Sequence, residues 1–363
     1  MSTQQDFLVE LGTEELPPTS LKALSKAFEV SVETQLKDVG LGFECIQAFA
    51  SPRRLALLVK HMAVATALSD VTLWGPPAKI AYDDKGEPSK ALLGFLKKNN
   101  MQLDAVSVAK DGKVDKIQCE IQTGGEPAVS LLPNIVERAL ADLPIPKRMR
   151  WGSSRNEFVR PAQWLVMLFG QDVVPCTILG MEASNFSRGH RFHADKSLKL
   201  NGATDYENVL LAEGKVIANF EHRQSKVEAQ VIELGKTLGG RAVIDPELLE
   251  EVTALVEWPV ALAGGFDERF LSVPPEALIS SMKEHQKYFH IEDAQGQLKA
   301  HFITVSNIES EDPAQVISGN EKVIRPRLAD AAFFFETDKK ATLQTHREKL
   351  KSCISSTAWF CIR

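Results

Sequence analysis

The sequence lacks the short motifs that mark the common nucleotide-binding and hydrolytic sites. It contains neither a GxxxxGK[ST] phosphate loop nor a GxGxxG turn after a strand, and it has no GxSxG nucleophile elbow. Its five cysteines are odd in number and scattered, and no two form a CxxC pair. We therefore expect no zinc knuckle, no disulfide framework and no serine or cysteine hydrolase.

The chain also lacks a long apolar run and an excess of basic residues. No segment approaches the length of a membrane span, and the N-terminus has no basic region followed by an apolar core. The formal net charge of −6 argues against a protein that coats nucleic acid without selectivity. A specific nucleic-acid partner would require the basic residues to cluster. The 363 residues suffice for two or three globular domains, and a cytoplasmic location is expected.

The most informative segment spans residues 7–18 and reads FLVELGTEELPP. Its apolar residues alternate as in a strand, which Gly12 and two prolines end, so Glu14 and Glu15 follow the strand directly. These carboxylates have three interpretations. They belong to a catalytic loop, they precede a helix that Thr19 or Ser20 caps and that runs to about Lys37, or one of them pairs with Arg53 or Arg54.

The rest of the chain mixes helices and strands without regular alternation, which predicts a multidomain α+β fold with mostly antiparallel sheets. A hairpin is expected at 106–121 around Asp111-Gly112, and a helix is expected at 275–288. Another helix is expected at 312–340, broken at Pro326. The predicted domains are a strand-helix-strand segment at 1–62, an α+β domain with the hairpin at 63–157, α+β structure at 158–340, and the start of a helical region with a tail at 341–363.

Two clusters of basic residues are candidates for RNA contact. In the first, Trp151 is surrounded by Lys147, Arg148, Arg150, Arg155 and Arg160, with only Glu157 opposing. The second is the loop 185–196, with possible phosphate donors at Arg188, His190, Arg191, His193 and Lys196, and aromatic faces at Phe186 and Phe192. Positive charge beside aromatic rings is typical of loop or single-stranded RNA recognition. A solvated linker for the first cluster and a hydrogen-bonded polar loop for the second are the alternatives.

Three further groups have weaker functional interpretations. His190, His193 and Asp195 have the residue types of a divalent metal site, which would make the protein a metal-dependent hydrolase, although the neighbouring arginines disfavour a cation. Glu284 and His285 combine an acid with an imidazole, but adjacent residues of a helix point in different directions, so a surface helix is favoured. The aromatic run at 333–335 indicates core or a partner surface.

Several short segments together resemble the beta subunit of the bacterial heterotetrameric glycyl-tRNA synthetase. They lie at 7–18, 51–55 (SPRRL), 149–152 (MRWG), 158–161 (FVRP), 188–192 (RGHRF), 257–259 (EWP), 284–289 (EHQKYF) and 325–331 (RPRLADA). Their number and their order along the chain carry the resemblance, which covers about residues 5–351.

The resemblance implies a division of labour between two polypeptides. The alpha subunit holds the active site that activates glycine with ATP and Mg²⁺, whereas the beta subunit is non-catalytic, helps to bind glycine tRNA and itself holds no cofactor or metal. The basic clusters then become candidate tRNA contacts: Arg148, Arg150, Trp151, Arg155, Arg188, His190, Arg191 and His193. An architectural fragment that docks on the alpha subunit without touching RNA is an alternative.

The chain departs from the family in two respects. Family members are about twice as long and continue into an HD-type helical region and an anticodon-binding domain. The tail after Lys351 does not resemble the family's continuation, and a shifted reading frame or an artefact would produce such a tail. We therefore expect that this polypeptide does not recognise the anticodon and supports tRNA charging poorly.

Overall fold

The computed structural model describes residues 3–83, 86–111, 114–340, 342–344 and 347. The chain divides into two compact units. One consists of Met1–Phe7, Val30–Ile46 and Val59–Asp142, and the other of Leu8–Glu29, Gln47–Leu58 and Leu143–Arg363. In the described part of the chain, no helix combines the length and the apolar character that crossing a membrane requires. The tail after Lys351 lies outside the described residues.

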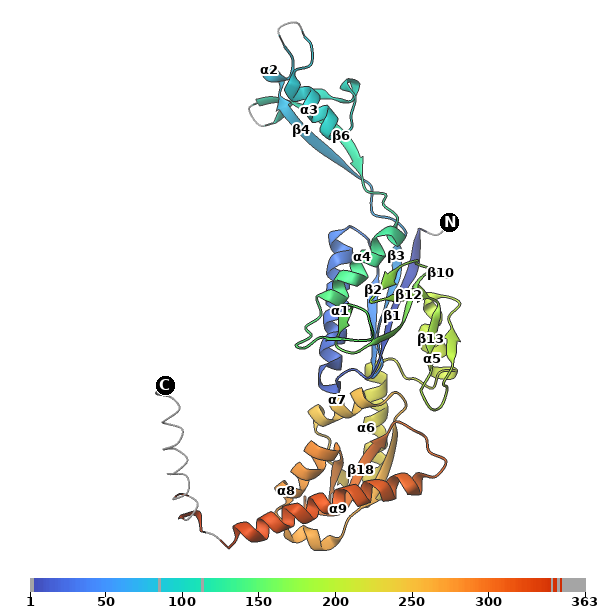
Figure 1. The fold of residues 1–363 in the computed structure, drawn as a ribbon, viewed down its shortest axis with the longest axis vertical. Helices are drawn as coiled ribbons and strands as arrows, with labels where there is room; N and C mark the ends of the chain where they lie inside the picture. The colour runs from blue at the N-terminus through green and yellow to red at the C-terminus, as the bar shows by residue number, and fades with distance from the viewer. Residues whose placement is uncertain (1–2, 84–85, 112–113, 341, 345–346, 348–363) are drawn as a thin grey trace. The chain divides into compact units, whose positions relative to one another are not determined.

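The largest sheet has the strand order β11-β12-β9-β1-β3-β2, and β10 pairs with β9. Figure 1 shows β1, β2 and β3 of this sheet side by side. Its strands are β1 (Gln4–Thr13), β2 (Cys45–Ser51), β3 (Arg54–Ala63), β9 (Ala162–Phe169), β10 (Asp172–Val173), β11 (Thr177–Ile178) and β12 (Met181–Ser184). The predicted first strand is confirmed as β1. From Phe7 to Thr13 its side chains are buried on both faces, so the alternating pattern alone underestimated its burial.

The first helix, α1 (Pro18–Asp38), buries one stripe of apolar side chains at helical spacing. The stripe consists of Leu21, Leu24, Phe28, Val32 and Leu36. The helix begins at Pro18, whose fixed φ and missing amide hydrogen suit the first helical position. Thr19 and Ser20 therefore lie inside the first turn, and the prediction that one of them caps the helix is wrong. Strand β2 was not predicted, because its alanines, serine and glutamine give little strand signal.

A small three-stranded antiparallel sheet lies in the first unit, with the order β4-β6-β5. Its elements are β4 (Ser69–Pro77), α2 (Ala78–Ala81), α3 (Lys90–Lys98), η1 (Leu103–Ala105), β5 (Ser107–Asp111) and β6 (Val114–Thr123), and α4 (Ala128–Ala141) follows. Leu92 and Leu96 of α3 pack with Ile117 of β6 to form its core. The predicted hairpin is confirmed by the pairing of Asp111 with Val114. Gly112 in its turn lies outside the described residues.

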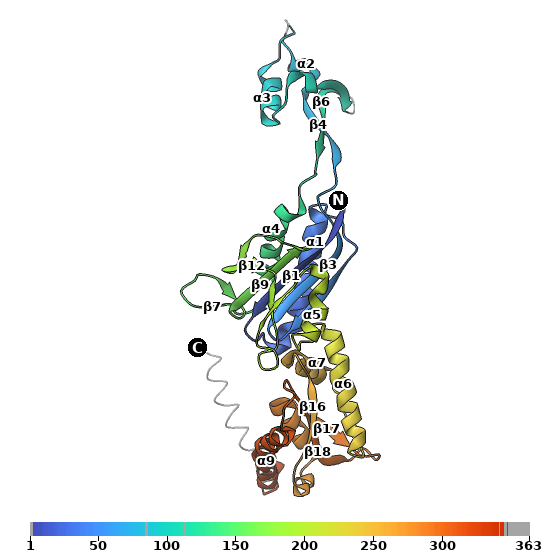
Figure 2. The ribbon, with the colours of Figure 1, turned by 90° about the vertical axis from the view of Figure 1, so that its right-hand side faces the viewer.

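In the second unit, a four-stranded sheet has the order β15-β17-β18-β16 and is covered by helices on both faces (Figure 2). Its strands and helices are α6 (Phe220–Thr237), β15 (Arg241–Ala242), α7 (Pro246–Leu255), β16 (Val260–Gly265), η3 (Glu268–Ser272), α8 (Pro275–Ser280), η4 (Ser281–His285), β17 (Phe289–Glu292), β18 (Leu298–Ser306) and α9 (Pro313–Asp338). The preceding η2 (Ala203–Asp205) and α5 (Tyr206–Ala212) pack on the largest sheet instead. Phe289 and Ile303 face α6 and α7. Phe302 faces α8 and α9.

Two predicted helices differ from the observed ones. The helix expected at 275–288 is α-helical only to Ser280 and continues as a π-helical segment to His285. Helix α9 passes through Pro326 without ending, so the predicted break there is wrong. Proline removes one helical hydrogen bond. On either side of it, Ile324 and Leu328 are fully buried in the same apolar cluster, which keeps both halves of the helix in place.

The predicted fold class is confirmed, because the described residues form a multidomain α+β structure with mostly antiparallel sheets. The predicted domain boundaries at residues 62, 157 and 340 stay predictions.

Candidate nucleic-acid interface

The opening segment ends in a tightly held loop. Gly12 lies under the indole of Trp164, and a Cβ atom at residue 12 would come within 1.9 Å of that ring. The amide of Thr13 donates to the carbonyl oxygen of Arg53 (2.8 Å), and the amide of Glu14 donates to that of Pro161 (3.0 Å). The loop that carries Glu14 and Glu15 is therefore fixed to two other segments of the chain.

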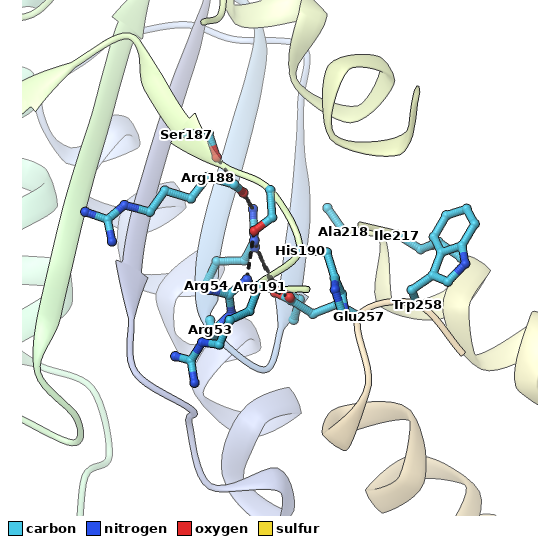
Figure 3. Close-up of polar contacts among 12 residues, drawn as sticks. Arg53, Arg54, Ser187, Arg188, His190, Arg191, Ile217, Ala218, Glu257 and Trp258 are labelled. Atoms are coloured by element: carbon cyan, nitrogen blue, oxygen red, sulfur yellow. Dashed lines mark hydrogen bonds and ion pairs between the residues drawn. The ribbon is translucent and has the colours of Figure 1, made fainter. Parts of the chain in front are cut away.

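A buried network of charges follows from Arg53 and Arg54, which Figure 3 shows beside Glu257. The Arg54 side chain is fully buried and contacts two carboxylates, Glu10 Oε1 and Glu257 Oε1, each at 3.1 Å. Arg53 Nη2 lies 2.8 Å from Glu257 Oε2. Burial alone would raise the pKa of Glu257, but Arg54 and Arg53 outweigh it and lower that pKa to about 2. Glu257 is therefore charged at neutral pH.

Glu14 and Glu15 pair with an arginine that the sequence did not indicate. Arg191 Nη2 lies 2.9 Å from Glu14 Oε2, and Arg191 Nη1 lies 2.9 Å from Glu15 Oε1. The hydrogen bond to Glu14 raises the pKa of Arg191. The interpretation that these carboxylates pair with Arg53 or Arg54 is wrong, because both of those arginines are turned toward the buried Glu257.

The two buried arginines also hold the loop 185–196. Arg54 Nη1 donates to the carbonyl oxygen of Arg188 (3.1 Å), and Arg53 Nη2 donates to that of Gly189 (2.9 Å). The loop begins in strand β13 (Phe186–Arg188), which pairs with β14 (Ser197–Lys199). Its backbone is thus fixed from inside the protein.

The outer side of this loop carries exposed rings and a cation. Phe186 and Phe192 are 46% and 68% exposed. The exposed guanidinium of Arg188 lies 5.2 Å from the centre of the Trp164 ring, and in the described part of the chain it enters no ion pair. Aromatic faces beside an uncompensated cation are the elements that RNA loops require.

His190 takes a different role from the one predicted. Its ring is fully buried, so it presents no donor to a phosphate outside the protein. Nδ1 accepts hydrogen bonds from the amides of Phe192 and His193, each at 3.2 Å. Burial lowers the pKa of His190, which keeps the ring neutral and Nδ1 available as an acceptor. His190 therefore shapes the loop and does not contact a ligand directly.

The metal alternative finds no support in this loop. Nδ1 of His190 is occupied by two amides, and Nε2 of His193 accepts a hydrogen bond from the amide of Glu309 (2.9 Å). Asp195 is exposed. Within the described ranges, no group of three or more His, Cys, Asp or Glu residues is placed to hold a metal ion.

The cluster around Trp151 is a short hairpin rather than a linker. Strand β7 (Met149–Arg150) pairs with β8 (Glu157–Phe158), and Arg150 Nε lies 2.6 Å from Glu157 Oε1. Trp151 is half-buried, and Arg148 Nη2 donates to the carbonyl oxygen of Leu143 (3.5 Å). Arg155 is exposed in the turn and enters no ion pair among the described residues. Arg155 thus presents the uncompensated charge of this hairpin.

The remaining candidates lie on surfaces or in other roles. Glu284 and His285 are exposed at the end of the π-helical segment, as expected for a surface helix. Sequence reasoning missed Glu10, Arg223 and Glu257. For Glu257 the sequence did contain a signal, because this residue is an isolated charge in an apolar run. A charged residue in such a run is buried only when it is paired.

Arg223 is fully buried, and its guanidinium lies 5.2 Å from the centre of the Phe220 ring. Its guanidinium donates to the carbonyl oxygens of Ala50, Ile217, Ala218 and Thr253. Burial lowers its pKa to about 9, so it stays charged at neutral pH. Arg223 thereby ties the end of β2 to the segment before α6 and to the last turn of α7.

The comparisons with known proteins agree with the resemblance. The profile of the glycyl-tRNA synthetase beta subunit family matches residues 7–356. This chain belongs to that family. A glycine–tRNA ligase beta subunit from Marinobacter nauticus is 51% identical over 351 residues, which cover 96% of this chain and 51% of the relative. The corresponding protein of Stutzerimonas stutzeri is 51% identical over 349 residues, covering 96% of this chain and 50% of the relative.

A third relative, from Pseudomonas aeruginosa, carries the same name and is 49% identical over 350 residues, again 96% of this chain and 50% of the relative. The chain thus spans about half the length of the curated relatives that it matches. Membership of the beta subunit family applies to nearly all of this chain, whereas the activity of a complete ligase belongs to the whole relatives.

Proposed function

We propose that this chain is the non-catalytic, tRNA-binding part of a glycine–tRNA ligase. In this proposal it assembles in the cytoplasm with an alpha subunit, as in a heterotetramer, and the alpha subunit uses ATP and Mg²⁺ to activate glycine. The family match over residues 7–356 carries the proposal.

The structure suggests how the tRNA-binding residues divide. Arg188 and Arg155 are exposed without an ion partner among the described residues, so they are our main candidates for phosphate contact. Arg191 and Arg150 are exposed but already paired with carboxylates. Trp151 and Arg148 belong to the same hairpin as Arg155, and His193 belongs to the same loop as Arg188. His190 shapes that loop from inside.

A titration of the chain with glycine tRNA at several salt concentrations tests the proposal, with and without the alpha subunit. Phosphate contacts release counterions, so the affinity is expected to fall steadily as ionic strength rises. Arg188→Glu should weaken binding about tenfold or more, because it removes one contact and adds repulsion at the same position.

Lys97→Glu is the matched control. Lys97 is also exposed and makes no ion pair in the described residues, but it lies on α3, outside both basic clusters. It should bind tRNA as the wild type does. Absence of salt-dependent binding in both settings would refute tRNA recognition and would leave the architectural role.

A further inference from the structure

The long helix α9 is buried along one side only. Ile324 and Leu328 are fully buried and pack with Phe270, Met282 and Phe302. The opposite side, which we call the α9 outer face, is exposed to solvent in the described structure. It consists of Lys322, Val323, Arg325, Pro326, Arg327, Asp330, Phe333 and Phe334.

The first part of the α9 outer face carries three uncompensated cations. Lys322, Arg325 and Arg327 are exposed and make no ion pair within the described residues. Asp330 is the single acid among these eight residues, and the exposed Glu336 further along is paired with Lys339 (2.8 Å). The neighbouring Glu321 is turned inward, where its carboxylate accepts a hydrogen bond from the amide of Gly265 (2.9 Å). Along the axis the three charges span about 7.5 Å, and around it Arg325 and Arg327 lie on either side of Lys322.

The second part carries two exposed aromatic rings. Phe333 and Phe334 are 65% and 63% exposed, and their ring centres lie 5.7 Å apart in an edge-to-face arrangement. The next residue, Phe335, instead packs at the apolar core. The exposed pair follows the cations by about 10 to 18 Å along the helix axis. Large apolar side chains on an otherwise charged face mark an interaction surface.

Pro326 adds a hydrogen-bond acceptor to the same face. In a regular helix, the amide of residue 326 would donate to the carbonyl oxygen of Lys322. Proline has no amide hydrogen, and the helix nevertheless continues through it. The Lys322 carbonyl is therefore left without its usual helical donor on an exposed turn, where a ribose 2′-hydroxyl can donate to it.

We propose that the α9 outer face binds RNA, with the three cations on phosphates and the two phenylalanines stacked on unpaired bases. Charge complementarity favours a polyanion, because three cations face one acid. The aromatic pair favours unpaired nucleotides over a duplex, because a base in a duplex offers no free face. The inference rests on the proposed function only in naming tRNA as the natural ligand.

Binding of three RNAs to the full chain tests the proposal: glycine tRNA, a blunt RNA duplex of similar length, and a single-stranded oligonucleotide. The triple variant Lys322→Glu, Arg325→Glu, Arg327→Glu should lower affinity for all three. It should also reduce the slope of log affinity against log salt by about 2 for the single strand, since each phosphate contact contributes about 0.7. Phe333→Ala with Phe334→Ala should weaken single-strand binding about fivefold to 100-fold and leave duplex binding unchanged.

Matched controls lie on α2 and α3. Lys90, Lys97 and Lys98 are exposed without ion partners in the described residues, so reversing all three changes net charge equally. Ile80→Ala with Leu93→Ala removes two exposed apolar side chains. Neither control should alter RNA affinity by more than about twofold, and thermal unfolding should be similar for all variants.

The outcomes separate this inference from the proposed function. If the wild type binds tRNA and both α9 variants bind equally well, the α9 outer face is not an RNA surface, whereas the proposed function stands. If the α9 variants no longer bind the alpha subunit but keep their RNA affinity, the α9 outer face binds protein and the inference is wrong. If the wild type binds no RNA with or without the alpha subunit, both fail.

Discussion

The loop 185–196 and the α9 outer face are both rich in basic residues in the sequence, but the structure treats their charges differently. In the loop, Arg191 is matched by Glu14 and Glu15, and His190 is buried. On α9, Lys322 and its two arginine neighbours have no acidic partner among the described residues. A basic stretch of sequence therefore does not by itself give a basic surface. The partners from other segments decide how much charge is left for a ligand.

The largest effect is expected from removing the carboxylate of Glu257, which pairs with the two arginines that hold the loop 185–196. Glu257→Ala would leave the buried Arg53 without a carboxylate and Arg54 with Glu10 alone, which should lower the free energy of unfolding by about 3–5 kcal/mol. Urea unfolding measures this change. Glu157→Ala is the control, because it breaks an exposed pair with Arg150 and should cost about 0–1 kcal/mol. Equal effects of the two variants would show that the buried network is not what anchors the loop.

The second effect is a dependence of stability on pH. The pKa of Glu257 is about 2 in the folded protein, against 4.5 when unperturbed. Because the folded pKa is depressed, its stabilisation is complete above pH 4.5 and is lost as pH falls toward 2. One pKa unit corresponds to about 1.4 kcal/mol, so the loss amounts to about 3.5 kcal/mol.

This loss is measured by comparing urea unfolding of the wild type and of Glu257→Gln from pH 6 to pH 2.5. The glutamine variant should be less stable at pH 6, and the two stabilities should converge as the pH falls. A difference in stability that stays constant over this range would contradict the assignment of a low pKa to Glu257.

The smallest effect is expected from freeing Arg191, whose pairing with carboxylates distinguishes the loop 185–196 from the α9 outer face. Glu14→Gln with Glu15→Gln should free Arg191 and make the loop resemble the α9 outer face in charge. We expect tRNA affinity to rise about twofold to tenfold and the salt dependence to steepen by about one phosphate contact. Stability should change by about 1 kcal/mol or less, because the pairs are half-exposed.

The control for this test is Arg191→Ala in the double glutamine background, which should remove most of the gain in tRNA affinity, since the freed guanidinium produces that gain. Titration of each variant with glycine tRNA across salt concentrations measures both the affinity and its salt dependence. Unchanged affinity of the double glutamine variant would mean that Arg191 does not face the bound RNA.

Local patterns predicted most of the elements, whereas contacts between distant segments could not be predicted. Strand β1, helix α1 and the hairpin of β5 and β6 follow from periodicity and turn residues. The partner of Glu14 could not be deduced in this way, because Arg191 lies 177 residues further along the chain. His190 misled for the same reason, since its burial depends on segments that its own sequence does not reveal.

Pro326 shows the converse limit. The local rule that proline ends a helix was overridden by the burial of Ile324 and Leu328 on either side of it. Burial of apolar side chains over several turns outweighs the loss of one hydrogen bond. The candidate site could likewise be predicted only in part. The sequence showed its residue types, but it did not show which of these side chains are exposed.

The buried network also has a consequence for protein synthesis. Arg54 and Glu257 are separated by 203 residues. At about 5–20 residues per second, the ribosome releases Glu257 roughly 10–40 s after Arg54. Until then, Glu10 is the one carboxylate of this network in the nascent chain, and burying both arginines would leave a positive charge uncompensated. The central strands β1 and β3 must therefore wait for a much later part of the nascent chain before their charged interior can close.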